Sequence, residues 1–470
     1  MKRFWRIPFA LSILLVHISD VSGQNDSLTL TFNDFMNAVS EHHPMAYSAR
    51  LKTEIGQANL QGARGAFDPK LYADISQKYF TGDQYYSLPM GGVKIPTWFG
   101  LEVEAGMSQN RGVYLNPENF QNSSGLYFAG VSLPVGQGLF IDQRRADLRK
   151  AQTMTKMAEV KQVLLLNELL FEAGKSYWQW FEAYNTVAVF QEALALASTR
   201  FEAVRQGAYL GDRPSIDTLE AGIQVQNRML MLQQAQLELA NSSLKLSVYL
   251  WLDGMVPLEL SEDATPDPLT EIPLDFELTD EYPKLDLLIN THPELVFQRL
   301  NLDRLEIDRR WKSEQLKPVL NLKYNALADP AVSYPVIDQN WRDYQWGLEF
   351  NMPIFLRKER SSLRIADLYI RENEFELMNK QAGINAAVNM AFNEWNTTRD
   401  QFRLYRQNVN DSRGLLNGER QLFDGGESSL FMVNSRELAY INAQVKMIEI
   451  ASKNQKSLLN AKYSLGKVFP

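Results

Sequence analysis

The sequence predicts a mainly α-helical fold with a smaller β part, in which long helical hairpins run antiparallel and the same plan occurs twice. No proline interrupts the stretch between Pro134 and Pro214 or the stretch between Pro353 and Pro470, and helix interiors exclude proline because it lacks the amide donor. Apolar residues in both stretches recur at steps of three and four, as in Phe190, Leu194, Ala197, Phe201 and Val204 and in Ile384, Val388, Ala391 and Trp395. A helix from about residue 144 to 206 would be roughly 95 Å long, so it needs lateral partners along its length.

Composition excludes several classes of function. The chain has 470 residues and a net charge of −8, with no basic tract, which argues against a nucleic-acid partner. Cysteine is absent, which excludes disulfides, thiolate metal sites and a cysteine nucleophile. The sequence also contains no phosphate loop, no nucleophile elbow and no metal-ligand spacing. We therefore expect no enzymatic activity and no cofactor or metal.

The N-terminus resembles a secretory signal peptide. Lys2, Arg3 and Arg6 precede a mostly apolar run at 7–18, and Val21 and Gly23 are small residues before a cut after position 23. A short membrane anchor is the alternative, but the run is shorter than the ~20 residues that a spanning helix needs. We interpret 1–23 as a signal peptide, so the mature chain is exported and any membrane crossing must use strands.

Matching landmarks indicate an internal twofold repeat. His43-Pro44 recurs as His292-Pro293, 249 residues later, and the same offset separates Pro69 from Pro318. We assign 24–253 to repeat 1 and 285–470 to repeat 2. The segment between them, 254–284, is rich in proline and acidic residues, and we expect an irregular, solvent-facing linker. The paired histidines mark helix boundaries rather than a ligand pair, and a short amphipathic helix is expected from about residue 28 to the first of them.

Alternating segments predict strands within 71–134 and within 319–353. In repeat 2 the runs 319–327 and 343–352 place apolar and aromatic residues at every second position, a pattern shared by half-buried soluble strands and by transmembrane β-strands. The export signal and the aromatic residues near the strand ends favour the transmembrane reading. The residues expected to face lipid are Leu320, Leu322, Tyr324, Tyr344, Trp346, Leu348 and Phe350.

Repeat 1 offers three patterned runs, near 71–80, 98–109 and 125–133. Because both flanking helices would lie on one side of the membrane, each repeat must cross an even number of times. Either 85–90 is a fourth, short strand, or the run at 98–109 lies in an extracellular elaboration; the sequence allows two or four strands here. So few strands cannot close a barrel alone, and open edges are forbidden in lipid, so the chain must oligomerise.

Each long helix is followed by a turn and a returning helix. Glycines mark the first tip, near 207–215, and the second tip, near 425–431; glycine commonly terminates helices. Ser215 and Ser428 are the expected N-caps of the returning helices.

This order of parts resembles the TolC-like outer-membrane efflux protein family. The resemblance rests on the two His-Pro phrases, on the strand exits at Leu133-Pro134 and Met352-Pro353, and on the glycine-marked tips, and it covers the mature chain. It implies a homotrimer in the outer membrane of a Gram-negative bacterium, whose hairpins form a trimeric α-barrel across the periplasm, continued by a shared trimeric β-barrel. It further implies a passive conduit whose tips meet a periplasmic adaptor protein linked to an inner-membrane pump.

The resemblance also suggests site residues. The expected adaptor-docking tips are Gly207, Tyr209, Leu210, Gly211, Ser215, Gly426, Ser429, Leu430 and Phe431. Such channels often carry acids in the second tip, where this chain has Met432 and Ser435. The candidate pore-entrance charges are instead in the first tip: Asp212, Arg213, Asp217 and Glu220. They either form a charged ring or are solvated charges favoured at a helix start, so an acidic ring is left open.

Two functions from different classes fit the sequence. The first is the outer-membrane duct of a multi-component efflux system, with a duct for type I protein secretion as a variant. The second is an exported structural coiled-coil protein of the envelope, or an adhesin. Strands that face lipid favour the first, and a monomer that washes off the membrane would favour the second.

Overall fold

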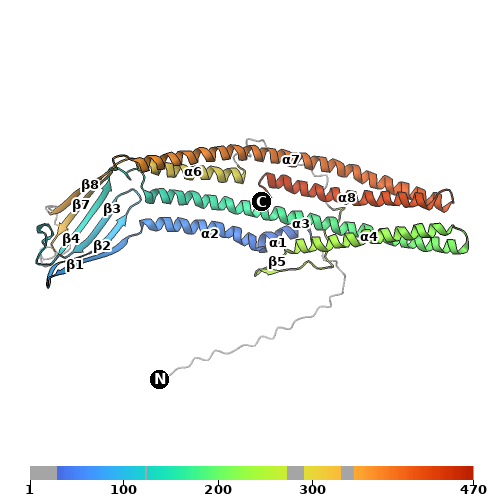
Figure 1. Cartoon of the computed structure of the whole chain (residues 1–470), viewed down its shortest axis with the longest axis horizontal. Coiled ribbons are helices and arrows are strands. Elements are labelled where there is room, and N and C mark those ends of the chain that lie inside the picture. Colours follow the sequence, from blue (N-terminus) through green and yellow to red (C-terminus); the bar gives the residue numbers. More distant parts are fainter. Residues whose placement is uncertain (1–28, 122–123, 272–290, 330–342, 469–470) are drawn as a thin grey trace, which may run out of the picture.

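The computed structural model describes residues 29–121, 124–271, 291–329 and 343–468, and the expected signal peptide lies outside them. Figure 1 shows an elongated molecule with a β-sheet at one end and two helical hairpin tips at the other. The helices are α1 (Phe32–His42), α2 (Pro44–Arg64), α3 (Gln143–Leu210), α4 (Ser215–Ser247), α6 (Pro293–Glu314), α7 (Arg357–Asp424) and α8 (Leu430–Ser464). None of the helices in these ranges combines the length and apolarity needed to cross a membrane.

The two long helices expected from the sequence are α3 and α7, of 68 residues each. Towards the tips the packing order is α4, α3, α8, α7, and towards the sheet it is α2, α3, α6, α7. Each long helix therefore packs against neighbours over its whole length. The halves share one order of elements, with a helix, strands, a long helix and a returning helix in each.

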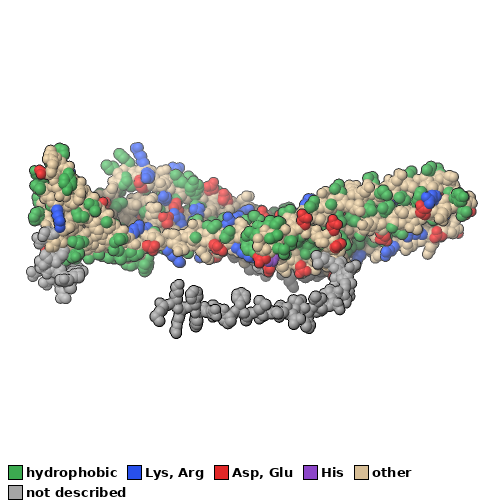
Figure 2. Space-filling view, turned by 90° about the horizontal axis from the view of Figure 1, so that it is seen from below, with side chains coloured by type: hydrophobic (Ala, Val, Ile, Leu, Met, Phe, Trp, Pro, Cys, Tyr) green, Lys and Arg blue, Asp and Glu red, His purple; other side chains and the backbone are tan. Residues whose placement is uncertain are grey.

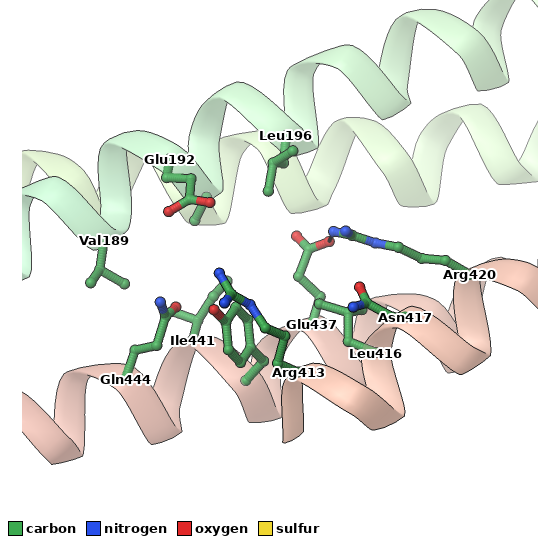
Figure 3. Close-up of a pocket in the computed structure, with 12 residues that line it drawn as sticks. Val189, Glu192, Leu196, Arg413, Leu416, Asn417, Arg420, Glu437, Ile441 and Gln444 are labelled. Carbon is green, nitrogen blue, oxygen red and sulfur yellow. Dashed lines mark hydrogen bonds and ion pairs between the residues drawn. The ribbon is translucent and has the colours of Figure 1, made fainter. Parts of the chain in front are cut away.

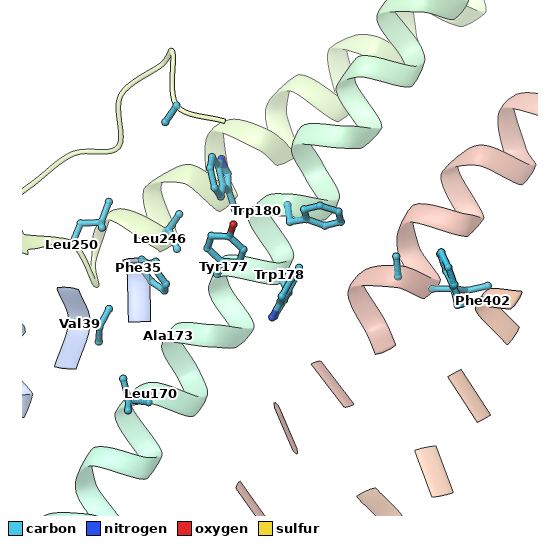
Figure 4. Packing of buried hydrophobic residues seen from close by; sticks show 14 residues of the cluster. Phe35, Val39, Leu170, Ala173, Tyr177, Trp178, Trp180, Leu246, Leu250 and Phe402 are labelled. Atoms are coloured by element: carbon cyan, nitrogen blue, oxygen red, sulfur yellow. The ribbon is translucent and has the colours of Figure 1, made fainter. Parts of the chain in front are cut away.

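The largest core lies at the waist of the molecule (Figure 4), where α1, α3, α4 and α8 meet. Tyr177, Trp180 and Phe181 of α3 are almost completely buried there against Phe35 of α1. The Tyr177 hydroxyl contacts the carbonyl oxygen of Leu30 at 2.9 Å. Trp178, Trp180 and Phe181 are thus packing residues, as their helical spacing indicates.

Most residues in the described part of the linker, 254–271, are exposed as expected, but the segment is anchored to the waist and is not irregular throughout. Val256–Pro257 forms β6, which pairs with β5 (Trp251–Leu252), and Ala264 is buried in the waist core. The Asp267 carboxylate accepts a hydrogen bond from the backbone N–H of Phe32 at 2.9 Å. Residues 29 and 30 bond to this segment too, so α1 begins at Phe32 rather than at 28. Residues 272–284 lie outside the described residues.

His43 and His292 begin α2 and α6 in the same way. The imidazole Nδ1 accepts the N–H of Met45 at 3.1 Å in the first case and the N–H of Glu294 at 3.2 Å in the second. A proline follows each histidine at the first helical position, where its missing N–H costs nothing. Both histidines are buried, and both cap helices.

The sheet has six antiparallel strands in the order β1-β2-β3-β4-β7-β8. They are β1 (Lys70–Phe80), β2 (Asp83–Pro96), β3 (Glu102–Ser108), β4 (Leu126–Pro134), β7 (Val319–Ala328) and β8 (Tyr344–Asn351). Repeat 1 therefore supplies four strands. The expected short strand at 85–90 is part of β2, which has 14 residues, and the run at 98–109 supplies β3 inside the sheet rather than an elaboration.

The register of the sheet collects apolar side chains on one face. Val103 pairs with Val131, Val131 with Tyr324, and Tyr324 with Trp346, and paired residues share a face. All seven residues expected to face lipid lie on this apolar face, with Leu71, Ala73, Ile75, Val93, Ile95, Val103, Ala105, Met107, Tyr127, Ala129, Val131 and Leu133. Figure 2 shows hydrophobic side chains on the surface at the sheet end of the molecule.

The histidine caps predict a pH-dependent stability. Burial lowers the pKa of both imidazoles, and at His292 this prevails over the opposing charge of Glu294. Only neutral imidazole can accept at Nδ1. The folded chain therefore binds fewer protons than the unfolded chain, so this stabilisation is complete above about pH 6.5, the pKa of a free histidine, and is lost as pH falls through the lowered values.

We expect the wild type to lose more thermal stability between pH 7.5 and 5 than the double variant His43→Asn/His292→Asn. Asparagine is a good N-cap that does not titrate. The measurement is the unfolding temperature at each pH, followed by circular dichroism. Equal losses in the two proteins would contradict the role of the caps.

Candidate functional site

The two hairpin tips are built by the same backbone motif. At the first tip the N–H of Asp212 bonds to the carbonyl of Gly207 at 2.9 Å, and the N–H of Gly211 bonds to Ala208. At the second tip Glu427 bonds to Leu422 at 2.8 Å, and Gly426 bonds to Phe423. This is the Schellman motif, whose C′ residue takes a left-handed conformation. Gly211 and Gly426 occupy that position, with φ of 82° and 75°.

Both expected N-caps are displaced by one residue. Pro214 is the N-cap of α4, so Ser215 is the first helical residue. Ser429 caps α8 by accepting the N–H of Met432, and the hydroxyl of Ser428 instead bonds to the Glu419 carboxylate. The second tip is therefore tied to α7 by a side chain as well as by its backbone.

Apolar side chains project from the tips. Tyr209 is 92% exposed, Leu210 72% and Phe431 67%. Leu430, which was expected to belong to the docking surface, is only 4% exposed and packs with Val204 and Ala221. It joins the two hairpins instead of facing outward. Of the other expected tip residues, Gly211, Gly426 and Ser429 lie between the helices. Gly207 lies in the last turn of α3 and Ser215 is the first residue of α4.

The four candidate entrance charges do not form one cluster. The Arg213 guanidinium lies over the ring of Phe423 at 4.3 Å, and Glu220 accepts from the side-chain amide of Asn434 at 3.0 Å. Asp212 is exposed, and Asp217 lies in the first turn of α4, where a negative charge is favoured by the helix dipole.

A buried ionic network joins the hairpins just above the tips. Glu437 of α8 forms ion pairs with Arg200 of α3 and Arg420 of α7, and Arg200 also donates to the Asn434 side chain at 3.0 Å. Figure 3 shows Glu437 and Arg420 beside a cleft between α3 and the α7–α8 hairpin, of about 220 Å³. Glu437 is only 3% exposed, so the carboxylate is shielded from water, while the side chains of Arg200 and Arg420 are 16% and 35% exposed.

Arg228 of α4 adds a further buried cation to this region, with 2% exposure. Burial lowers the pKa of its guanidinium, and the charge of Glu437 opposes that effect. Sequence reasoning missed this network, although a signal is present. Asn434 and Glu437 fall on a helix face that otherwise buries Leu430, Ile441 and Ile448, and polar residues in such a stripe indicate buried pairing.

Within the described ranges no group of three histidine, aspartate or glutamate side chains could hold a metal ion. The assembled site consists of apolar projections at the tips and an ionic lock between the hairpins. Such an arrangement can bind another protein and can hold helices together.

Long paired helical hairpins that end in a sheet with one apolar face define a class of elongated, mainly helical proteins. Residues 285–466 match the family model described as "Outer membrane efflux protein". This part of the chain is similar to that family, and the resemblance inferred from the sequence is confirmed. No curated protein matches the sequence.

Solved channel structures share the fold over nearly the whole chain. The Campylobacter jejuni CmeC outer membrane channel is 14% identical, with 93% of this chain and 86% of that chain covered and a TM-score of 0.64. The MtrE outer membrane channel of Neisseria gonorrhoeae, in its open state, is 12% identical, with 93% and 89% covered and a TM-score of 0.68. The outer membrane protein VceC of Vibrio cholerae is also 12% identical, with 93% and 96% covered and a TM-score of 0.64. The fold is therefore that of outer membrane channels.

The ionic network predicts unequal effects of two alanine substitutions on α8. Glu437→Ala removes the counter-charge of the partly exposed Arg200 and Arg420 and of the buried Arg228, and should cost up to roughly 3–5 kcal/mol. Glu449→Ala removes an exposed pair with Lys446 and should cost about 0–1 kcal/mol. Chemical unfolding monitored by circular dichroism measures both, and similar costs would show that Glu437 does not stabilise the seam.

Proposed function

We propose that this protein is the outer-membrane duct of a multi-component efflux system in a Gram-negative bacterium. It acts as a homotrimer and as a passive, non-enzymatic conduit from an inner-membrane pump, across the periplasm and through the outer membrane. The observation that carries the proposal is that, within the described residues, the sheet and the helical layer each end in two margins that no other element covers. β1, α2 and α4 lie along one margin, and β8 and α7 lie along the other.

The sheet supports closure by further copies. Its two edge strands, β1 and β8, run in opposite directions, because strand direction alternates across the sheet and the number of strands is even. β1 of one copy can therefore pair with β8 of the next and continue the alternation. A ring closed in this way is a shared β-barrel with its apolar face outward, as lipid requires.

The helical margins support the same contact. Five apolar residues of α4 recur at intervals of seven and are all more than half exposed: Ile216, Ile223, Leu230, Leu237 and Leu244. A heptad stripe is typical of a helix that packs along a second long helix. On the opposite margin, α7 exposes Leu404, Leu415 and Leu422. Repeated head-to-tail contacts of this kind generate a closed ring when the rotation allows it, and the ring of hairpins is the proposed α-barrel.

The shared order of elements supports the assignment of 24–253 and 285–470 to two copies of one repeat. The exposed tips, with Tyr209, Leu210 and Phe431, are proposed to dock a periplasmic adaptor protein. The alternative of an envelope spacer or adhesin leaves the apolar face of the sheet without a covering surface, and for this reason we favour the duct.

Engineered disulfides test ring closure, because the chain has no cysteine of its own. The double variant Ala73→Cys/Leu348→Cys places one thiol on each edge strand, both on the apolar face. We expect oxidation to yield covalent trimers from outer membranes, and the native mass of the wild type in mild detergent to be that of a trimer. Phe350→Cys or Trp346→Cys, on the same face of β8, with Ala73→Cys covers neighbouring registers.

Asp74→Cys/Leu348→Cys is the matched control, because its two side chains point to opposite faces of the sheet, and it should not cross-link. Monomers released by carbonate washing, with no intermolecular disulfide in any variant, would contradict the proposed duct.

The tips give a second functional prediction. Leu210→Glu/Phe431→Glu should abolish complementation of a deletion strain and adaptor capture, because charge disrupts an apolar docking surface, while trimers stay intact. Leu252→Glu, at an exposed position of the waist, should retain both activities. Full complementation by the tip variant would show that docking occurs elsewhere.

A further inference from the structure

We infer that the wall of the membrane barrel contains eighteen strands, six from each of three chains, because repeat 1 inserts the additional hairpin β2–β3 into the wall. The inference rests on the proposed trimeric duct and specifies the width of its outer-membrane part. It places β2 and β3 in the barrel wall. Repeat 2 has no strands that correspond to them, and the family match at 285–466 does not include them.

The internal repeat identifies the additional hairpin. β1 follows α2 as β7 follows α6, and β4 precedes α3 as β8 precedes α7. Repeat 2 thus contributes one hairpin, and repeat 1 contributes the corresponding β1 and β4 with β2 and β3 between them. β1 and β4 run in opposite directions, so a sheet without β2–β3 would also be antiparallel.

Backbone pairing places β2–β3 within the sheet on both sides. β2 pairs with β1 from Lys70↔Lys94 to Phe80↔Asp83, and β3 pairs with β4 from Glu102↔Ser132 to Ser108↔Leu126. The turn between β2 and β3 lies at the helical end, where Glu102 forms ion pairs with Lys94 at 2.7 Å and with Arg144 of α3 at 3.2 Å. The hairpin is therefore anchored to both neighbouring strands and to the adjoining helix.

The side chains of the hairpin match a wall position. Val93, Ile95, Val103 and Ala105 continue the apolar face between Leu71 of β1 and Val131 of β4. A hairpin folded into an aqueous lumen would expose this apolar surface to water, at a cost of about 25 cal/mol per Å². In the wall the same surface faces lipid.

The opposite face carries glycines where the strands approach most closely. A Cβ added at Gly106 would lie 2.4 Å from the carbonyl oxygen of Gly91 and 2.7 Å from the Phe128 ring. A Cβ at Gly130 would lie 2.3 Å from the carbonyl oxygen of Tyr324. Glycines at such positions let a sheet curl towards their side, which is the proposed lumen.

Strand number sets the width of a barrel. With strands ~4.8 Å apart and tilted by ~40°, eighteen strands give a diameter of about 35 Å between backbones, compared with about 24 Å for twelve. A wall of this size encloses an open aqueous channel unless something fills it. The additional hairpin therefore widens the exit of the duct without changing the helical part.

Labelled single-cysteine variants in proteoliposomes test the inference. Ala105→Cys reports on β3, Leu348→Cys on the apolar face of β8, and Lys323→Cys on the opposite face of β7. Each thiol carries the environment-sensitive fluorophore NBD, and quenching is measured with doxyl-labelled lipids and with aqueous iodide. We expect lipid quenching at Ala105 and Leu348 several-fold stronger than at Lys323, and the reverse order with iodide.

The outcomes separate the two proposals. Lipid quenching at Leu348 with iodide quenching at Ala105 would place the hairpin outside the wall and overturn the eighteen-strand inference, while the membrane duct would stand. Absence of lipid quenching at both positions would overturn the proposed function as well. Val93→Cys, on the neighbouring strand and the same face, repeats the test if Ala105→Cys fails to assemble.

Discussion

The constraint on which this structure depends is that its elements are too long and too flat to bury their apolar surfaces within one chain. A helix of 68 residues extends over roughly 100 Å, so no single core can cover it. The apolar residues are distributed in four clusters along the seams between helices. The sheet has no helix over its apolar face, and Leu71, Trp346 and Phe350 are 84%, 62% and 66% exposed in the isolated chain.

Buried polar groups fix how the long helices slide along one another. Apolar heptad seams alone tolerate shifts of register, and a polar residue within the seam selects one register. Ser452 of α8 donates to the carbonyl of Trp178 on α3 at 2.8 Å, and the side-chain amide of Asn454 lies 3.1 Å from the hydroxyl of Thr398 on α7. Glu437 and Arg200 add an ionic contact close to the tips. The contacts between α3 and α8 fix the axial position of one hairpin relative to the other, and both tips lie at the same end of the molecule.

The sequence predicted the parts of the fold that have strong periodicity. The long proline-free stretches with helical periodicity predicted both long helices. The alternating runs at 319–327 and 343–352 predicted β7 and β8 with bounds within one residue of those observed. β2 was predicted only as a possible short strand at 85–90, and Pro89, Gly91 and Gly92 interrupt the alternation there. In the structure Pro89 lies at the end of the β2–β3 ladder, where a missing N–H is tolerated. The packing of the linker on Tyr177 depends on contacts between residues 90 positions apart, which a local pattern does not contain.

Site residues were harder to predict than elements, because exposure depends on the angle at which each hairpin packs. Leu430 and Phe431 are adjacent in sequence, but only Phe431 faces outward. The ionic network could not be predicted from local sequence patterns, because its members come from four different helices, α3, α4, α7 and α8.

The two halves differ most where they meet other surfaces. Their helical parts correspond closely, with histidine-capped helices and identical tip motifs. Repeat 1 differs by the additional hairpin at one end and by an acid in the first turn of its returning helix at the other. Of the four candidate entrance charges, Arg213 is engaged with Phe423 and Glu220 with Asn434. Asp212 and Asp217 therefore carry the negative charge of the first tip. In the second tip Glu427 takes the place of Asp212, whereas Met432 takes the place of Asp217 and Ser435 that of Glu220. In a trimer the two kinds of tip would alternate around the entrance. A partner could distinguish the hairpins of repeat 1 from those of repeat 2 by the first turn of the returning helix, which carries Asp217 in repeat 1 and Met432 in repeat 2, while both tips offer the same backbone geometry.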